Sequence, residues 1–153
     1  MSKRFPAGVL LLVVLAWCSI GLTEPPAGRS GFRANELIDT DGFLADVAEA
    51  MKLRNGRTLT EEEFLRMASA PGTVVLDARS ASLFAEMHLA GAVNLPFTEF
   101  TAEALARVIP SKDTRVLIYC NNNIRNMPVV FASKLPTAAL NLSTFPALYS
   151  YGY

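Results

Sequence analysis

The spacing of apolar residues along the chain predicts five helices. In each segment, apolar side chains recur every three or four positions, as on the buried face of an amphipathic helix. Ser, Thr or Asp residues precede the first four segments, and a side-chain oxygen there can bond the free amide groups of a first turn. The predicted helices cover residues 42–54, 61–70, 81–89, 102–109 and 140–152, and Pro146 is expected to kink the last one or to force it to begin there.

Two of these helices carry specific start signals. Thr40 or Asp41 can cap the first, and residues 60–63, Thr-Glu-Glu-Glu, have the spacing of a capping box at the start of the second. The side chains expected to face the core are Phe64, Leu65 and Met67 in the second helix and Leu83, Phe84 and Met87 in the third.

Three short apolar runs, 73–78, 92–95 and 115–119, separate the helices and are bounded by turn-forming residues. Strands that alternate with helices are typical of an α/β fold with a parallel sheet. In open parallel sheets, ligands bind at the carboxyl ends of the strands. Cys120 directly follows the third run, so we expect the chemistry of this protein to take place there.

Residues 1–23 have the three-part layout of a secretory signal peptide. Two basic residues precede an apolar run over 7–17, and small residues follow up to Gly21, where we expect cleavage. An uncleaved anchor is the alternative, although the run is short for a membrane span. Lipidation at Cys18 is less favoured, because Trp17 stands where a bacterial lipobox needs a small residue. Export places the protein in the periplasm or outside the cell, with residues 24–56 as a linker and N-terminal helix.

Charge and composition exclude several classes of function. The chain has 14 Lys plus Arg and 14 Asp plus Glu, so no positive excess points to a nucleic acid or to an anionic membrane surface. We expect membrane contact only through the signal or an anchor. With one His, two Cys and neither a CxxC nor an HExxH spacing, the sequence predicts no metal site and no cofactor. After cleavage Cys120 would be the only cysteine, which excludes an internal disulfide.

Three motifs follow one another in the order that one known family shows. Asp77-Ala78-Arg79 ends the first strand, residues 88–96 read His-Leu-Ala-Gly-Ala-Val-Asn-Leu-Pro, and Cys120 is followed by Asn-Asn-Asn-Ile-Arg. With these motifs, residues 57–153 resemble the rhodanese-like (sulfurtransferase) domain family. The resemblance implies a five-stranded parallel sheet with helices on both faces. In the family a last strand follows a Gly-Tyr pair, and because Gly152-Tyr153 ends this sequence, we expect that strand to be missing and the domain to be truncated.

The resemblance also implies a mechanism, in which Cys120 is a nucleophile that carries sulfur as a persulfide. The loop expected to bind the substrate consists of Asn121, Asn122, Asn123, Ile124 and Arg125. Its backbone amides would favour the thiolate, and Arg125 would contact the anionic end of a sulfur donor such as thiosulfate. A thiol or cyanide would accept the sulfur. Related phosphatases have a loop one residue longer between Cys and Arg, which disfavours phosphate ester hydrolysis here.

Three further residues of the motifs are expected to have structural roles. Asp77 and Arg79 would order the turn after the first strand, as an ion pair. His88 is the only histidine, but its place at the end of a helix, before a turn, favours a structural hydrogen bond over catalysis.

Departures from the family pattern support a second hypothesis. Many members have Arg or Gln directly after the Cys and Gly two positions later, where this chain has Asn121 and Asn123. Asn123 can still close the loop, because Asn tolerates left-handed backbone. Prolines within residues 126–137 prevent an uninterrupted helix after the loop, which reduces any helix-dipole contribution to thiolate activation. The alternative function is a catalytically weak rhodanese-fold binding or sensor module in the periplasm. At the residue level, a buried structural Cys120 and a solvated Arg125 remain the alternatives.

Overall fold

A computed structural model describes residues 35–127 and 129–153. The predicted signal peptide, Cys18 and most of the predicted linker lie outside the described residues and stay predictions. In the two described ranges, no helix combines the length and the apolar composition that crossing a membrane requires. Leu37–Tyr153 form one compact unit.

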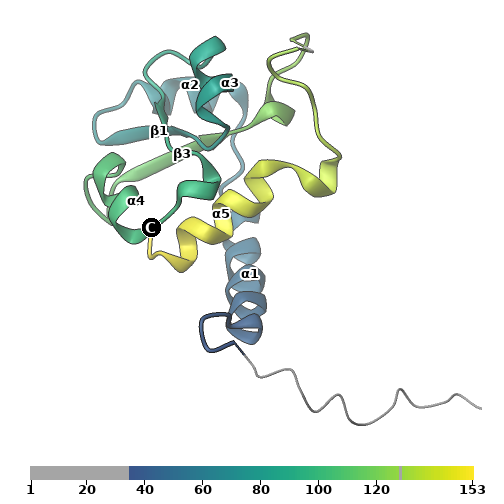
Figure 1. Cartoon of the computed structure of the whole chain (residues 1–153). Helices are drawn as coiled ribbons and strands as arrows, with labels where there is room; N and C mark the ends of the chain where they lie inside the picture. Colours follow the sequence, from purple (N-terminus) through teal and green to yellow (C-terminus); the bar gives the residue numbers. More distant parts are fainter. Residues whose placement is uncertain (1–34, 128) are drawn as a thin grey trace, which may run out of the picture. The chain divides into compact units, whose positions relative to one another are not determined.

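Three parallel strands form the sheet, in the order β2-β1-β3. The neighbouring strands β1 and β3 are labelled in Figure 1. They are β1 (Thr73–Asp77), β2 (Val93–Asn94) and β3 (Arg115–Tyr119), so β2 is shorter than the predicted run. Leu76 of β1 pairs with Val93 of β2 and with Ile118 of β3. The predicted α/β class and parallel sheet are confirmed. Among the described residues the sheet has three strands, where the resemblance implies five.

The helices follow the predicted segments, with differences at their ends. The α-helices are α1 (Thr40–Asn55), α2 (Glu61–Ala68), α3 (Ala81–Glu86), α4 (Ala102–Val108) and α5 (Leu140–Ser150), and the 3-10 helices are η1 (Phe97–Glu99), η2 (Asn121–Asn123) and η3 (Pro136–Ala138). The capping box of α2 is confirmed, because the Thr60 hydroxyl accepts from the Glu63 amide at 3.2 Å and the Glu63 carboxylate accepts from the Thr60 amide at 2.8 Å. The predicted cap of α1 is wrong by one position, since Asp39 accepts from the Gly42 amide.

The end of α3 also differs from the prediction. The helix ends at Glu86 instead of Leu89, because Met87 has extended backbone and its carbonyl oxygen accepts a hydrogen bond from the Arg79 guanidinium at 2.7 Å. The Met87 side chain is 41% exposed, so its predicted place in the core is wrong. The hydrogen bond from Arg79, which precedes the helix, therefore overrides the helical periodicity at its end.

Helix α5 contains Pro146 and does not begin there. A proline inside a helix removes one backbone hydrogen bond, and its ring crowds the preceding turn. Thr144, Pro146 and Leu148 are all buried, so this side of α5 faces the core. Burial of that face offsets the local cost of the proline.

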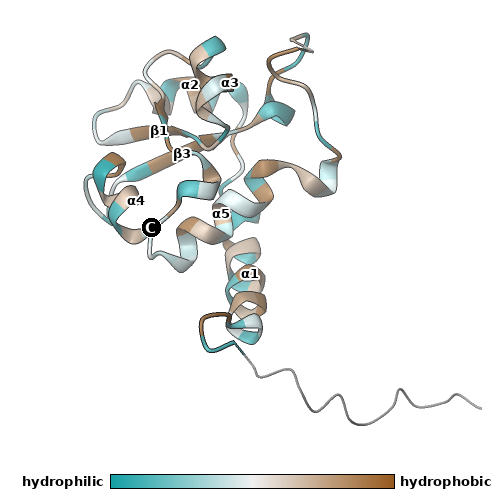
Figure 2. Ribbon diagram, viewed as in Figure 1, coloured by the Kyte–Doolittle hydropathy of each residue, from teal (hydrophilic) through white to brown (hydrophobic). Residues whose placement is uncertain are grey.

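Side chains of the sheet alternate between two apolar layers, which helices cover on both faces (Figure 2). The buried residues of the first layer, under α4 and α5, are Leu76, Leu95, Ala104, Leu105, Ile109 and Leu148. Those of the second layer, on the side of α2, are Val75, Leu117, Tyr119 and Phe131. Phe64 and Met67 of α2 pack there as predicted, but Leu65 is 55% exposed, so its predicted burial is wrong. Helix α1 packs along α5, where the Ser150 hydroxyl donates to Asp46 at 2.6 Å.

Candidate functional site

Cys120 lies where the parallel sheet predicts chemistry, directly after the carboxyl end of β3. The chain then turns through η2, the three asparagines Asn121–Asn123. The Cys120 side chain is only 1% exposed, and it is a free thiol. The candidate nucleophile is thus at the expected place but is covered by protein in this conformation.

Asn121 and Asn122 connect this loop to residues 132–134 through hydrogen bonds. The Asn121 side-chain amide donates to the Ala132 carbonyl oxygen at 3.0 Å. Asn122 and Lys134 exchange two hydrogen bonds, from Asn122 Nδ2 to the Lys134 carbonyl at 2.8 Å and from the Lys134 amide to Asn122 Oδ1 at 3.1 Å. The side chains predicted to bind substrate are therefore hydrogen-bonded to the backbone of residues 132–134.

The third asparagine holds the cysteine itself. Asn123 Oδ1 accepts from the Cys120 backbone amide at 2.9 Å and from Asn141 Nδ2 at 3.0 Å, and the Asn123 backbone amide faces the Cys120 sulfur. Because the Cys120 amide must meet an oxygen, Asn141 must present its nitrogen to Asn123. That orientation leaves Asn141 Oδ1 buried without a hydrogen-bond partner among the described residues.

Asn141, at the start of α5, is a site residue that the sequence did not reveal. No local motif connects it with Cys120, and only the return of α5 to the sheet brings the two together.

The loop after Cys120 is a tight turn and not the open ring of amides that the resemblance implies. The Asn123 amide donates to the Cys120 carbonyl at 3.0 Å, and the Ile124 amide donates to the Asn121 carbonyl at 3.3 Å. The left-handed backbone expected at Asn123 occurs instead at Asn126, with φ of 63°. As the prolines predict, no α-helix follows the loop before α5 among the described residues 121–127 and 129–139. The Asn123 amide, which donates to the Cys120 carbonyl, also faces the Cys120 sulfur.

Arg79 forms a buried ion pair with Asp77 beside the strand ends. The guanidinium donates to the Asp77 carboxylate at 2.7–3.0 Å, and Arg79 is 2% exposed. It also donates to the carbonyl oxygens of Met87 at 2.7 Å and Val130 at 3.3 Å, and it lies over the Phe131 ring at 4.1 Å. One side chain thereby ties β1, the end of α3 and the segment after the cysteine loop.

Tyr119, the last residue of β3, completes this cluster. Its hydroxyl donates to Asp77 and accepts from the Leu89 amide at 3.2 Å. Burial, together with the hydrogen bond to the Asp77 carboxylate, raises the pKa of Tyr119 to about 12. Burial alone would lower the pKa of Arg79, but the hydrogen bond to Asp77 and its charge raise that pKa overall. The phenol is therefore neutral, and the guanidinium charged, at ordinary pH.

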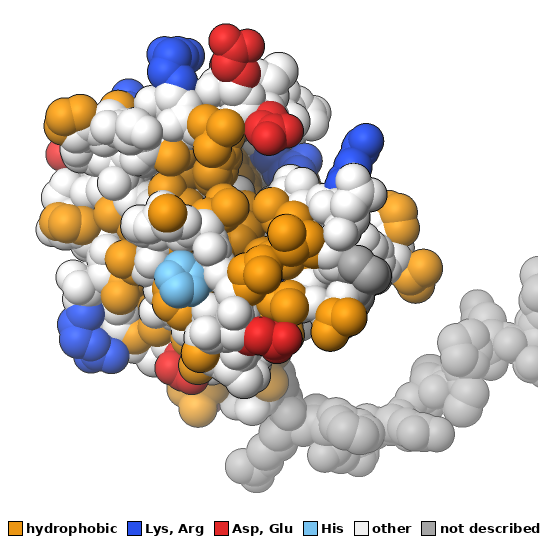
Figure 3. Space-filling model, turned by 90° about the horizontal axis from the view of Figure 1, so that it is seen from above, with side chains coloured by type: hydrophobic (Ala, Val, Ile, Leu, Met, Phe, Trp, Pro, Cys, Tyr) orange, Lys and Arg blue, Asp and Glu red, His pale blue; other side chains and the backbone are white. Residues whose placement is uncertain are grey.

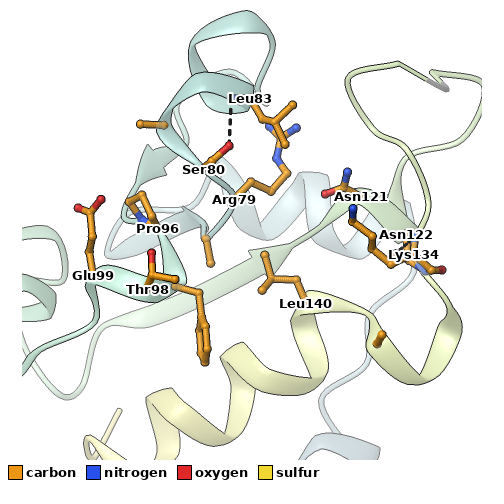
Figure 4. A pocket seen from close by; sticks show the side chains of 14 residues that line it. Arg79, Ser80, Leu83, Pro96, Thr98, Glu99, Asn121, Asn122, Lys134 and Leu140 are labelled. Carbon is orange, nitrogen blue, oxygen red and sulfur yellow. Dashed lines mark hydrogen bonds between the residues drawn. The ribbon is translucent and has the colours of Figure 1, made fainter.

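A groove lies at the carboxyl ends of the strands, and we call it the strand-end groove (Figure 4). Its volume is about 490 Å³, and it is lined by Ala78, Arg79, Ser80, Ala81, Leu83, Pro96, Phe97, Thr98, Glu99, Asn121, Asn122, Lys134, Ala138 and Leu140. Asn121 and Asn122 connect it to the cysteine loop, although Cys120 is not among the lining residues. Glu99 lies at one end and Lys134 at the other, beside Asn122 (Figure 4).

The remaining predicted site residues lie outside this groove. Arg125 is exposed and lines a second, open hollow together with Ile124. His88 is exposed, stacks on the Phe84 ring at 3.8 Å and hydrogen-bonds the Phe84 carbonyl through Nδ1 at 2.7 Å (Figure 3, pale blue). In the described part of the chain, no group of His, Cys, Asp and Glu side chains could hold a metal ion.

The comparisons with known proteins point to one family. Residues 60–153 match the family model described as a rhodanese-like domain, and this match contains all three sequence motifs. Neither the curated proteins nor the solved structures yielded a match. The matched segment is more than half of the chain and holds the sheet, Cys120 and the strand-end groove. The chain therefore belongs to the rhodanese-like domain family.

Proposed function

We propose that this protein is a sulfurtransferase that passes a sulfane sulfur through a persulfide on Cys120. The observation that carries the proposal is the placement of a free thiol at the carboxyl end of β3, within a rhodanese-like domain. Two features of the site support it. The Asn123 amide faces the sulfur, and the strand-end groove begins at the next residue, Asn121.

In the first step the Cys120 thiolate attacks the outer sulfur of thiosulfate. The new S–S bond forms as the bond within thiosulfate breaks, and sulfite leaves with the electron pair. In the second step a thiolate or cyanide attacks the outer sulfur of the persulfide, and the Cys120 thiolate leaves. The proton lost from the thiol goes to solvent. The Asn123 amide faces the Cys120 sulfur while it also donates to the Cys120 carbonyl, so its shared donor stabilises part of the negative charge on the sulfur in both steps.

The covered thiol must become accessible for this chemistry. The contacts that hold η2 against residues 132–134 are the side-chain hydrogen bonds of Asn121 and Asn122. A typical intramolecular hydrogen bond contributes only about 0.5–1.5 kcal/mol net. Opening of the loop is therefore within thermal reach, and donor binding in the groove would favour it.

The second candidate is a rhodanese-fold binding or sensor module that transfers sulfur poorly. Three observations favour it: Cys120 is buried, the loop amides are used within the turn, and Arg125 lines a different hollow from the strand-end groove. In that case the groove would bind a ligand without turnover.

Intact mass before and after thiosulfate separates the two candidates. The test uses the full chain with Cys18→Ser as background, so that Cys120 is the only thiol. A gain of one sulfur atom that is absent in the added Cys120→Ser variant supports the sulfurtransferase. No gain, in protein shown to be folded by circular dichroism, favours the binding module. Thiosulfate-to-cyanide transfer that survives Cys120→Ser would refute the mechanism.

We also propose that the protein is exported and that residues 1–23 are then removed. The support is the basic, apolar and small-residue order of that segment. Mass of the protein isolated from its native cells, together with fractionation, tests this. A mature form that still contains residues 1–23, or one that carries lipid on Cys18, would contradict it.

A further inference from the structure

The segment that hydrogen-bonds the cysteine loop, residues 120–125, has no buried residue of its own. From residue 132 to residue 143 every residue is exposed or half-buried, and we call this stretch the flap (Figure 1). It consists of an extended piece, η3 and the first turn of α5. Segments with few buried apolar contacts can open locally, at a much smaller free energy than unfolding of the whole domain requires.

The flap lies between two buried anchors. Phe131, directly before it, is 3% exposed and packs against the Arg79 guanidinium at 4.1 Å. Thr144 and Pro146, which follow the flap, are buried on the core side of α5. Pro146 has no amide hydrogen, so the Leu142 carbonyl lacks the helical hydrogen bond that residue 146 would otherwise donate. The flap can therefore move between two fixed points, and α5 is weakened where the flap ends.

Asparagine side chains provide the hydrogen bonds between the flap and the cysteine loop in the described part of the chain. Each bond favours the closed form by only about two- to tenfold, because water replaces it on opening. The bonds run from Asn121 to Ala132, in both directions between Asn122 and Lys134, and from Asn141 to Asn123.

Closure of the flap has a cost at Asn141. Asn123 Oδ1 accepts from Asn141 Nδ2 at 3.0 Å and from the Cys120 amide at 2.9 Å, so the flap reaches the cysteine through one side chain. Asn141 Oδ1 is buried without a hydrogen-bond partner among the described residues. A buried oxygen without a donor has lost its hydration, and opening of the flap restores it. This oxygen brings the open form closer in free energy to the closed form.

We propose that the flap is a gate over Cys120, which opens between Phe131 and Pro146 while the sheet stays folded. Cys120 is 1% exposed in the closed form and becomes accessible when the gate opens. The inference rests on the proposed function only for what the gate admits, the sulfur donor and acceptor. Opening itself requires no sulfur transfer.

The first experiment measures access to Cys120 by iodoacetamide alkylation without denaturant, followed by intact mass, in the full chain with Cys18→Ser. Asn122→Ala removes both hydrogen bonds to Lys134 and should speed alkylation about three- to tenfold. The matched control is Asn55→Ala, which removes an exposed asparagine at the end of α1 and should leave the rate unchanged. Equal rates in Asn122→Ala and in this control overturn the gate.

A variant of the α2 cap distinguishes opening of the gate from unfolding of the whole domain. Thr60→Ala lowers global stability but lies outside the flap and the cysteine loop. With local opening of the gate, its alkylation rate should equal that of the unmodified chain. If Cys120 reacts only after global unfolding, Thr60→Ala should be alkylated about fivefold faster, and that result overturns the gate.

The thiosulfate test of the proposed function is independent of these rates. Faster alkylation of Asn122→Ala, in a protein that never forms a persulfide, supports the gate and refutes the sulfurtransferase. Persulfide formation together with alkylation that follows global stability does the reverse.

Discussion

Replacement of Arg79 is expected to cause a large loss in the free energy of unfolding. The guanidinium holds the buried Asp77 carboxylate and two backbone carbonyls, those of Met87 and Val130. Arg79→Met keeps the apolar length of the side chain but leaves the Asp77 charge buried without its counter-ion. Among the described residues, the Asp77 carboxylate then keeps hydrogen bonds from the Tyr119 hydroxyl and from the backbone amide of residue 79.

The size of the effect follows from the burial of the pair. Removing one partner of a buried ion pair typically costs about 3–5 kcal/mol, and small domains have a total stability of about 5–15 kcal/mol. With a urea dependence of about 1–3 kcal/mol per molar, the unfolding midpoint should fall by roughly 2 M. Arg79→Lys keeps the charge but loses the planar fork and the stacking on Phe131, so we expect an intermediate loss.

Urea unfolding followed by far-ultraviolet circular dichroism measures these changes. A double-mutant cycle with Asp77→Leu supplies the control, because the double variant has no unpaired buried charge. The double variant should be clearly more stable than the sum of the two single losses predicts. A loss under about 1 kcal/mol for Arg79→Met, or simple additivity in the cycle, would refute the reasoning.

Three further predictions concern separate contacts. The pKa of Tyr119 is raised to about 12 in the folded protein, so its contribution to stability is complete below its pKa in the unfolded chain, near 10, and is lost as pH rises from about 10 to 12. Tyr119→Phe should lack this loss of about 2–3 kcal/mol. Identical pH profiles of the urea midpoint for the two proteins would contradict the prediction. Asn141→Leu removes one donor from Asn123, so alkylation of Cys120 by iodoacetamide should become about fivefold faster, whereas an unchanged rate would show that this contact does not hold the loop. Thr60→Ala removes the α2 cap and should lower stability by about 1 kcal/mol in urea, with Thr58→Ala, outside the box, as a control that should change less.

Local patterns in the sequence determined the secondary structure and the position of the thiol. The caps at Thr60, Ser80 and Thr101 bond amides three residues on, and the strands β1 and β3 are marked by local apolar runs between turn-forming residues, so both can be recognised without the fold. Parallel topology then placed Cys120 at a strand end. Asp39, Thr40 and Asp41 can all cap a helix, so the sequence does not decide which of them begins α1, and the structure shows that it is Asp39.

Tertiary structure alone decided what surrounds the thiol. Asn141 reaches Asn123 because α5 packs back on the sheet, and Met87 leaves its helix because Arg79 binds its carbonyl. Glu99 and Lys134 come to one groove from different segments, whereas Arg125, close to Cys120 in sequence, lines another hollow. Periodicity and capping report hydrogen bonds between near neighbours in the chain. Contacts between distant segments depend on how the helices pack, and no local pattern encodes that packing.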